Sequence, residues 1–354
     1  MAAIVKDAVV RLEVVPGPDS FWRRFVNLRT LASFAVVAML LVWLGTHVHF
    51  DYGSTLRTLA HVNAAVFALA LASFYLSFLA RTRRWQLLLR NAGEQGRFQS
   101  LLHILMLTWF ANCVLPAKAG DLYRAYLLRR NTSTSGAKGL GTVLSERVLD
   151  FLVLMSLLML SGLALFRTAI PVRFEGALIT GLVIALVLLA GMVGLQRNHD
   201  RITELVPQRF RVRAVQFKVG LIDALRRDRL TLVGLTVGVW AAESARLYLV
   251  TLALPLGVRL GPAHIIFIAL VASLLTTIPA LPGGLVLVEG GMIAVLVFFG
   301  LAPSVALSVA LLDRLISFWT PIVVGIVILA MSGQGHPHRP ALRSGSPSPA
   351  VHFE

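Results

Sequence analysis

Ionisable residues follow a proline break in an otherwise apolar part of the chain. Lys118, Asp121 and Arg124 lie just after Pro116, in the stretch FANCVLPAKAGDLYRAYLLRR. We expect Pro116 to end the incoming helix, Gly120 to permit a turn and Asp121 to cap a new helix. Because a helix start offers free N–H groups and the positive end of a dipole, it could hold an anion such as a phosphate together with the two cations.

A second Leu-Pro break occurs in LPGGLVLVEGG and carries a single carboxylate, Glu289. Gly283 and Gly284 are expected to allow a close approach of the backbone there. This stretch contains no Lys or Arg, so the positive partner of Glu289 would be Arg314 or Arg246.

Acid–arginine pairs lie within two apolar stretches, as Glu146-Arg147 and Asp313-Arg314. Asp150 follows Glu146 by one turn, so these two carboxylates share a helix face and could fork an arginine. An ionisable group at membrane depth costs at least ~2.5 kcal/mol on insertion scales and usually pairs, so each is a candidate site residue. The alternative is an ion-pair network that orders the helices without touching a ligand.

The chain offers no motif for nucleotide, cofactor or metal chemistry. It contains no Walker A loop, dinucleotide fingerprint, HExxH, histidine–acid cluster or nucleophile elbow, and its one cysteine is Cys113. We therefore expect no catalytic residue, no cofactor and no metal site, and we interpret Cys113 as a packing residue. An intramembrane enzyme that uses Asp121, Glu146 or Glu289 remains an alternative.

Membrane helices must position these residues. Hydrophobic residues make up 57% of the 354 positions and charged residues 14%, and the mean hydropathy is +0.78, as is typical of a multi-span helical membrane protein. Two interrupted apolar stretches, 101–115 and 261–300, predict broken re-entrant hairpins. Uninterrupted runs long enough to cross about 30 Å of hydrocarbon predict six spans, at 31–48, 56–80, 140–165, 177–195, 230–256 and 305–331.

The formal charge of +16 does not indicate nucleic-acid binding, because the basic residues gather in the loops between spans. By the positive-inside rule, those loops and both termini are expected on the cytoplasmic side of the inner membrane. Arg83, Arg84 and Trp85 are interpreted as an interfacial anchor. We divide the chain into three parts. These are a cytoplasmic segment (1–30), a transmembrane domain (31–331) that includes an amphipathic cytoplasmic loop (196–229), and a disordered cytoplasmic tail (332–354).

The chain also contains an internal repeat. LPAKAGDLYRAYLL is followed by LSERVLDFL, and LPGGLVLVEGGMIAVLVFFG is followed at a similar distance by LLDRLISFW. In each copy a Leu-Pro break leads to an acid, Asp121 or Glu289, and a later helix carries the acid–arginine pair. Counting spans gives the copies opposite orientations, which predicts an all-α fold of about six spans plus two broken hairpins in an inverted repeat. A rival count, in which 261–300 forms two full spans, stays open.

These segments resemble the lysylphosphatidylglycerol synthase transmembrane region, also called the flippase-like integral membrane family. The resemblance rests on RRWQLLL, NCVLPAKAGDLYRAYLL, LSERVLDFL, LPGGLVLVEGG and ALLDRLISFW. It implies translocation of lipids between leaflets, especially phospholipids or polyprenyl-linked precursors. Some members are fused to an aminoacyl-transfer domain, which is not expected here. The family often has Gly-Glu at Gly120-Asp121, and an arginine where this chain has Leu287-Val288.

We therefore expect a multi-pass membrane protein that flips an anionic phospholipid or a polyprenyl-linked phosphate lipid by alternating access. One alternative is a non-transporting partner that presents a lipid to a membrane glycosyl- or acyltransferase; another is an intramembrane lipid transferase. The expected partners are membrane lipids and such an enzyme, with the oligomeric state left open. The expected headgroup-binding residues are Lys118, Gly120, Asp121, Arg124, Glu146, Arg147, Asp150, Arg246, Gly283, Gly284, Glu289, Asp313 and Arg314.

Overall fold

The computed structural model of the chain describes residues 51–333 except 116–117, 133, 168–170, 198–206, 259 and 278–281, together with Ala35 and Met39. The predicted segment 1–30, most of the first span 31–48 and nearly all of the tail 332–354 lie outside the described residues, as does Pro116. The described part of the chain is all helical, which agrees with the predicted fold class.

Within the described residues, four helical stretches are long and apolar enough to cross a membrane: Ala64–Asn91, Gly136–Phe166, Phe174–Arg197 and Pro303–Met331. They lie at the spans predicted for 56–80, 140–165, 177–195 and 305–331. The corresponding helices are α5 (Ala64–Asn91), α8 (Gly136–Phe166), α9 (Val172–Arg197) and, in continuous succession, α15 (Pro303–Arg314), η4 (Leu315–Trp319) and α16 (Thr320–Gly333).

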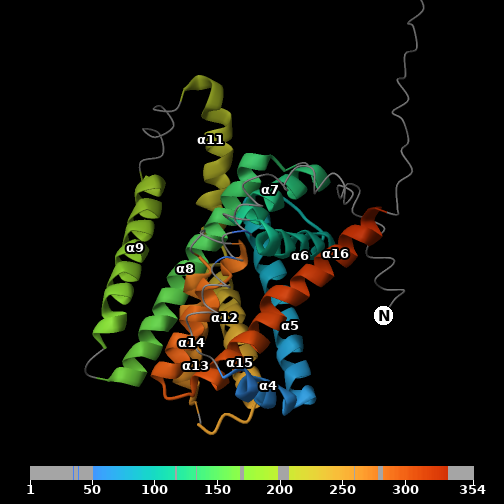
Figure 1. Ribbon diagram of the computed structural model, residues 1–354. Helices are drawn as coiled ribbons and strands as arrows, with labels where there is room; N and C mark the ends of the chain where they lie inside the picture. The colour runs from blue at the N-terminus through green and yellow to red at the C-terminus, as the bar shows by residue number, and fades with distance from the viewer. Residues whose placement is uncertain are drawn as a thin grey trace, which may run out of the picture.

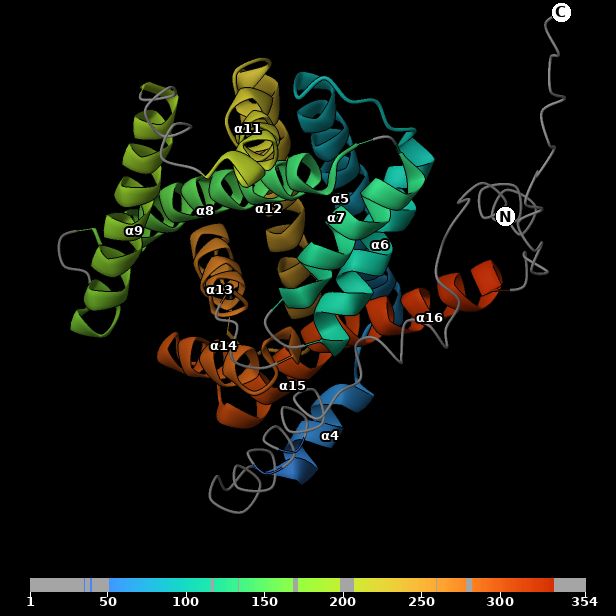
Figure 2. The same cartoon turned by 90° about the horizontal axis from the view of Figure 1, so that it is seen from above.

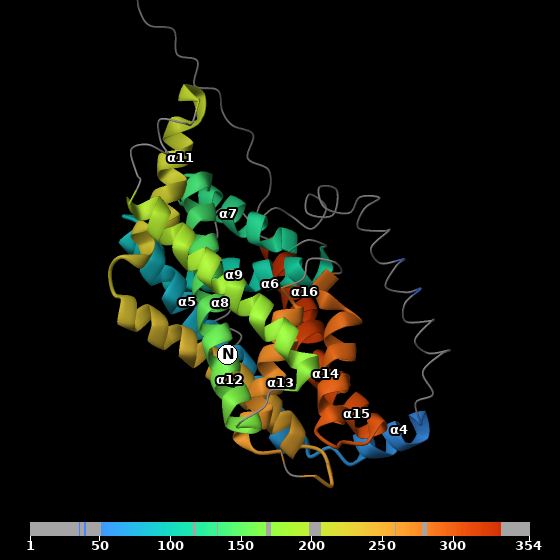
Figure 3. The ribbon, with the colours of Figure 1, turned by 90° about the vertical axis from the view of Figure 1, so that its left-hand side faces the viewer.

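The stretch 230–256 forms helix α12 (Arg229–Leu252). α12 carries Glu243 and Arg246 in its interior and is not among the four apolar helices, so its crossing of the membrane stays a prediction. α12 packs along α5 (Figure 3), and this contact is one of the main ones in the bundle.

Both predicted breaks are present, and each separates two short helices. α6 (Phe98–Val114) precedes α7 (Ala119–Asn131), and α13 (Pro262–Leu275) precedes α14 (Leu287–Phe298), with the short 3-10 turn η3 (Pro282–Gly284) between them. In each case the two short helices pack against each other. The α6–α7 pair and the α13–α14 pair lie towards opposite ends of the molecule (Figure 1).

The first break turns differently from our prediction. Lys118 adopts the left-handed conformation, with φ 53° and ψ 37°, and occupies the N-cap position of α7. Asp121 therefore lies in the first turn and does not cap the helix, which corrects the prediction. Gly120 is not the turning residue either. A Cβ there would meet the Thr108 carbonyl oxygen and the Asn112 side chain, so glycine lets α7 lie directly against α6.

Other described helices pack onto these. α11 (Gln208–Leu221) packs on α8, where a Cβ on Gly141 would meet the Phe217 carbonyl oxygen. α9 lies against α8 at the edge of the molecule, and α4 (Tyr52–Ala60) lies against α15 (Figure 2). α16 crosses α6. The largest buried cluster includes Phe74, Phe78 and Phe267 and joins α5 to the helices of the second half.

Candidate functional site

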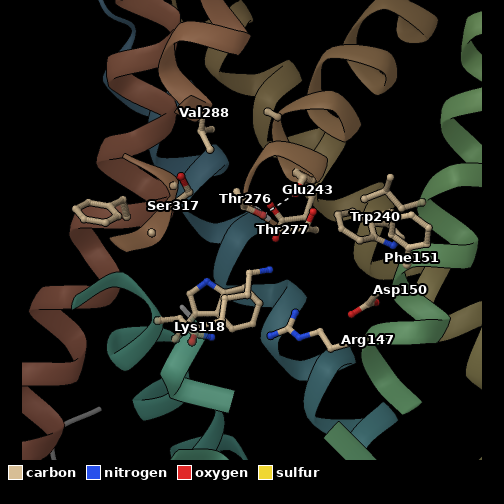
Figure 4. Close-up of a pocket in the computed structure, with 18 of the residues that line it drawn as sticks. Lys118, Arg147, Asp150, Phe151, Trp240, Glu243, Thr276, Thr277, Val288 and Ser317 are labelled. Atoms are coloured by element: carbon tan, nitrogen blue, oxygen red, sulfur yellow. Dashed lines mark hydrogen bonds between the residues drawn. The ribbon is translucent and has the colours of Figure 1, made fainter. Parts of the chain in front are cut away.

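A cavity of about 430 Å³ lies between the two broken segments. Lys118 and Asp121 line it from the first segment, and Gly283 and Gly284 line it from the second. The walls come from α5, α6, α8, α9, α12, α13, α15 and η4, and they combine charged side chains with apolar ones. Figure 4 shows Lys118 and Arg147 on one side and Thr276, Thr277 and Glu243 across from them.

An arginine on α8 holds the acid of the first broken segment. Arg147 donates from Nε to Asp121 Oδ2 at 2.9 Å and from Nη2 to Oδ1 at 2.7 Å. A planar guanidinium fits a carboxylate in this two-point geometry. The amide of Asn112 also donates to Asp121 Oδ1, at 3.2 Å. The first turn of α7 is therefore fixed to α6 and α8.

The second broken segment is held in the same way. Arg314 Nε donates to Glu289 Oε1 at 2.7 Å, and Arg314 Nη2 donates to the Gly283 carbonyl oxygen at 2.7 Å. Of the two predicted partners of Glu289, the structure therefore selects Arg314. Gly283 and Gly284 both have positive φ, and a Cβ on Gly283 would meet the Phe318 ring. The predicted close backbone approach at these glycines is confirmed.

The two carboxylates on α8 share one arginine, as their spacing predicts. Arg84 Nη2 donates to Glu146 Oε1 at 2.9 Å and to Asp150 Oδ2 at 3.0 Å. Arg124 Nη2 donates to the second oxygen of Glu146 at 2.8 Å. Arg84 is 0% exposed in its side chain and Arg124 is 1% exposed. Because isolated buried charges are costly, these pairs lock α5, α7 and α8 together.

A corresponding cluster joins α5, α12 and α15. Arg246 pairs with Asp313 and, at 3.0 Å, with Glu243. Glu243 also accepts from Arg81 Nη2 at 2.7 Å. Asp313 thus binds the arginine of α12 as Glu146 binds Arg84 of α5. In both halves, the neighbouring arginine of the acid–arginine pair holds the broken segment.

The predicted site residues divide between the cavity wall and the layer behind it. The residues that line the cavity are Lys118, Asp121, Arg147, Asp150, Arg246, Gly283, Gly284, Asp313 and Arg314. The others, Gly120, Arg124, Glu146 and Glu289, do not line it. Arg124 instead stacks over the Trp85 ring, with 3.8 Å between the guanidinium carbon and the ring centroid.

Sequence reasoning missed two arginines of the network, Arg81 and Arg84. We interpreted Arg84 as part of an interfacial anchor, whereas it is the centre of the α5–α8 cluster. The available signal was spacing: Arg81 and Arg84 lie one turn apart and face the bundle, while Arg83 between them bonds only to Gln86 among the described residues. Trp109 and Trp240, which also line the cavity, were not singled out.

Nothing in the described residues forms a metal site, because no three His, Cys, Asp or Glu side chains gather in a suitable group. Cys113 is buried, as its interpretation as a packing residue requires.

Comparison with known proteins agrees with the resemblance seen in the motifs. The profile described as the lysylphosphatidylglycerol synthase TM region matches residues 30–325. A UPF0104 membrane protein of Methanocaldococcus jannaschii is 32% identical over 219 residues, which cover 62% of this chain and 92% of that protein. A UPF0104 membrane protein of Methanothermobacter thermautotrophicus is 27% identical over 336 residues, or 87% of this chain and 95% of that protein.

A protein named glycosyltransferase AglD, from Haloferax volcanii, is also similar. It is 25% identical over 353 residues, which cover 87% of this chain but only 56% of that protein. The similar region therefore occurs there as part of a longer chain.

Proposed function

The chain belongs to the family of the lysylphosphatidylglycerol synthase TM region, and from this premise we propose that it flips an anionic phospholipid or a polyprenyl-linked phosphate lipid between membrane leaflets. The observation that carries the proposal is the cavity where both broken segments meet. Irregular backbone at membrane depth is tolerated only beside protein or a water-filled cavity, since an unpaired peptide group in lipid costs several kcal/mol. A polar headgroup can cross in such a place.

The cavity wall supports a division of the lipid between two environments. Lys118 offers a positive group for a phosphate, and hydroxyls such as those of Thr276 and Thr277 lie across from it (Figure 4). Leu144 of α8, which is 42% exposed, and Leu188 of α9 also line the cavity. We propose that the acyl or prenyl tail leaves between α8 and α9 and stays in lipid while the headgroup crosses.

The repeated pairing pattern supports alternating access. Arg147–Asp121 and Arg314–Glu289 hold the two broken segments in equivalent ways, on either side of one cavity. Transporters built from inverted repeats commonly rock one half against the other around a fixed site. We propose that the first broken segment takes the headgroup from the cytoplasmic leaflet and that the second releases it on the outer side. We also propose that the protein lies in the inner membrane, with both chain termini in the cytoplasm.

Reconstitution tests this proposal. Purified protein is placed in liposomes with fluorescent phospholipids or polyprenyl phosphates, and a membrane-impermeant quencher reports which headgroups face outwards. We expect the fraction of fluorescent headgroups that are protected from the quencher to fall faster in liposomes with protein than in protein-free liposomes of the same composition. Equal rates with and without protein for every lipid tested would refute flipping.

A second candidate function is the presentation of a lipid to a separate membrane glycosyl- or acyltransferase. The similarity to part of the protein named glycosyltransferase AglD favours it, because a similar region accompanies further sequence there. The same liposomes discriminate: lipid binding without movement favours presentation. Chemically altered lipid recovered from the liposomes would instead indicate that the chain is an intramembrane transferase.

A further inference from the structure

The ion pairs around the cavity balance one another. Among the residues that the structure describes, six arginines and six carboxylates take part, and each of them has at least one partner of opposite sign. The arginines are Arg81, Arg84, Arg124, Arg147, Arg246 and Arg314; the carboxylates are Asp121, Glu146, Asp150, Glu243, Glu289 and Asp313. The network as a whole therefore carries no net charge.

Lys118 is a cation of the cavity lining that lies outside this balanced network. It lines the cavity (Figure 4) and makes no ion pair or hydrogen bond with any other residue that the structure describes. The neighbouring positions outside the description, 116–117 and 278–281, hold no ionisable side chains in the sequence. The lining of the cavity thus has a surplus of one positive charge, located at the first break.

The arginines of the network bring no unbalanced positive charge to a ligand. Arg147, for example, donates to Asp121 from Nε and Nη2, so its Nη1 can still donate to a ligand while its charge stays balanced by that carboxylate. If Arg147 turned to a ligand, Asp121 would keep only the Asn112 amide as a described hydrogen-bond donor. Release of Arg314 would leave Glu289, whose Oε2 already lacks a hydrogen-bond partner among the described residues. An unpaired charge away from bulk water is strongly unfavourable, so each arginine is committed to its carboxylate.

The far wall of the cavity does not favour a second negative charge either. Its carboxylates, Glu243 and Asp313, are balanced by Arg81 and Arg246, and the charge of Arg314 is balanced by Glu289. Thr276, Thr277 and Ser317 also line it and provide hydroxyl groups. This wall fits an uncharged, hydroxyl-bearing part of a headgroup, such as glycerol or a sugar.

We propose that the cavity selects a lipid headgroup with a single negative charge, which means a phosphodiester, and discriminates against a phosphomonoester. The inference rests on the proposed lipid function and narrows its substrate class. A diester carries one negative charge at neutral pH, whereas a terminal phosphate carries about −1.5 to −2. Lys118 neutralises the first completely and the second only in part. A glycerophosphate diester or a sugar-phosphate-linked prenol therefore fits, and a free prenyl phosphate does not.

Binding in detergent solution tests this selection apart from transport. The matched probes are dioctanoyl phosphatidylglycerol, a diester, and dioctanoyl phosphatidic acid, a monoester with the same tails, measured by calorimetry at neutral pH. We expect the diester to bind roughly tenfold more tightly or better, since the additional charge of the monoester would enter the cavity without a partner of opposite sign. Equal or tighter binding of the monoester would overturn the proposal. This comparison uses the unmodified protein, so it stands whether or not variants fold.

Variants of Lys118 test whether this side chain provides the charge contact with the diester. Lys118→Met should bind the diester about tenfold more weakly, and Lys118→Arg should retain binding. Arg83→Met, which removes a cation outside the cavity, serves as the matched control and should bind as the unmodified protein does. Unchanged binding of the diester by a folded Lys118→Met variant would also overturn the proposal.

The charge selection and the flipping proposal can fail separately. Tight diester binding without movement in liposomes would refute flipping and leave the selection in place. Movement that favours phosphatidic acid over phosphatidylglycerol would refute the selection and leave flipping in place.

Discussion

Arg81 of α5 and Glu243 of α12 lie 2.7 Å apart, from Nη2 to Oε1, with both side chains buried. The two helices belong to different halves of the repeat that the sequence predicts, so this pair joins the halves directly beside the cavity. The Arg81 guanidinium also lies over the Trp109 ring, 4.5 Å from its centroid. A relative movement of α5 and α12 must therefore accommodate this pair.

The two partners should differ in how much stability their removal costs. Glu243→Gln leaves Arg81 without a described carboxylate, so we expect a loss of about 3–5 kcal/mol in the free energy of unfolding. Arg81→Met leaves Glu243 paired with Arg246, and we expect a smaller loss, about 1–3 kcal/mol. Chemical unfolding in detergent micelles measures both. Arg83→Met is the control, expected within about 0.5 kcal/mol; equal losses for the first two variants would contradict the pairing described.

The two-point contact between Arg147 and Asp121 should matter for transport. Lysine keeps the charge but lacks the planar fork, so we expect Arg147→Lys to slow lipid movement in liposomes by roughly tenfold. Arg314→Lys should slow it similarly, because that arginine holds the second broken segment in the same way. Arg129→Lys, at an exposed position of α7, is the control. An effect in only one of the two halves would argue against their equivalence.

The contact between α6 and α7 should not tolerate a methyl group at Gly120. A Cβ there meets the backbone oxygen of Thr108 and the side chain of Asn112, so we expect Gly120→Ala to cost about 1–3 kcal/mol of stability. Gly191 on α9 provides the matched control, since nothing lies within 4 Å of a Cβ at that position. Gly191→Ala should be neutral or stabilising by up to about 1 kcal/mol. Thermal unfolding of the two variants side by side gives the comparison.

The opposite orientation of the halves can be tested by thiol labelling. In a Cys113→Ser background, Arg130→Cys and Phe298→Cys place one exposed thiol at the far end of each broken segment, away from the cavity that both breaks line. We expect an impermeant maleimide to label the first from the cytoplasmic side and the second from the outer side, because the repeat is predicted to be inverted. Labelling of both from one face would rule out the inverted arrangement.

The positions of the helices could be predicted from the sequence to within several residues. Long apolar runs and the two Leu-Pro breaks are local signals, and they place α8, α9 and the α15–α16 stretch as well as both interruptions. The prediction of the turn at the first break is wrong in detail. Gly120 is predicted to permit the turn, but the residue in the left-handed conformation is Lys118. A single non-glycine residue in that conformation leaves no local sequence signal.

The candidate site was predicted in part, for a physical reason. Buried charges usually pair, so the sequence offers an ion-pair network around Glu146 and Asp313 as the alternative to a headgroup site. Their partners could not be chosen, because Arg84 lies 62 residues from Glu146 in sequence and Arg246 lies 67 from Asp313. Such choices depend on how helices cross. The predicted headgroup role of these residues stays a prediction.

The π-helical stretch η4 directly follows Arg314, and it separates α15 from α16 without ending the helix. Its wider turn brings Phe318 against Gly283 and places the ring 4.8 Å from the Arg314 guanidinium carbon. Since one residue of an α-helix corresponds to about 100° of rotation, removal of a single residue from 315–319 would swing the whole of α16 around its axis and carry that aromatic side chain off the glycine. The number of residues in η4 thus fixes the rotation of α16 about its axis relative to α15.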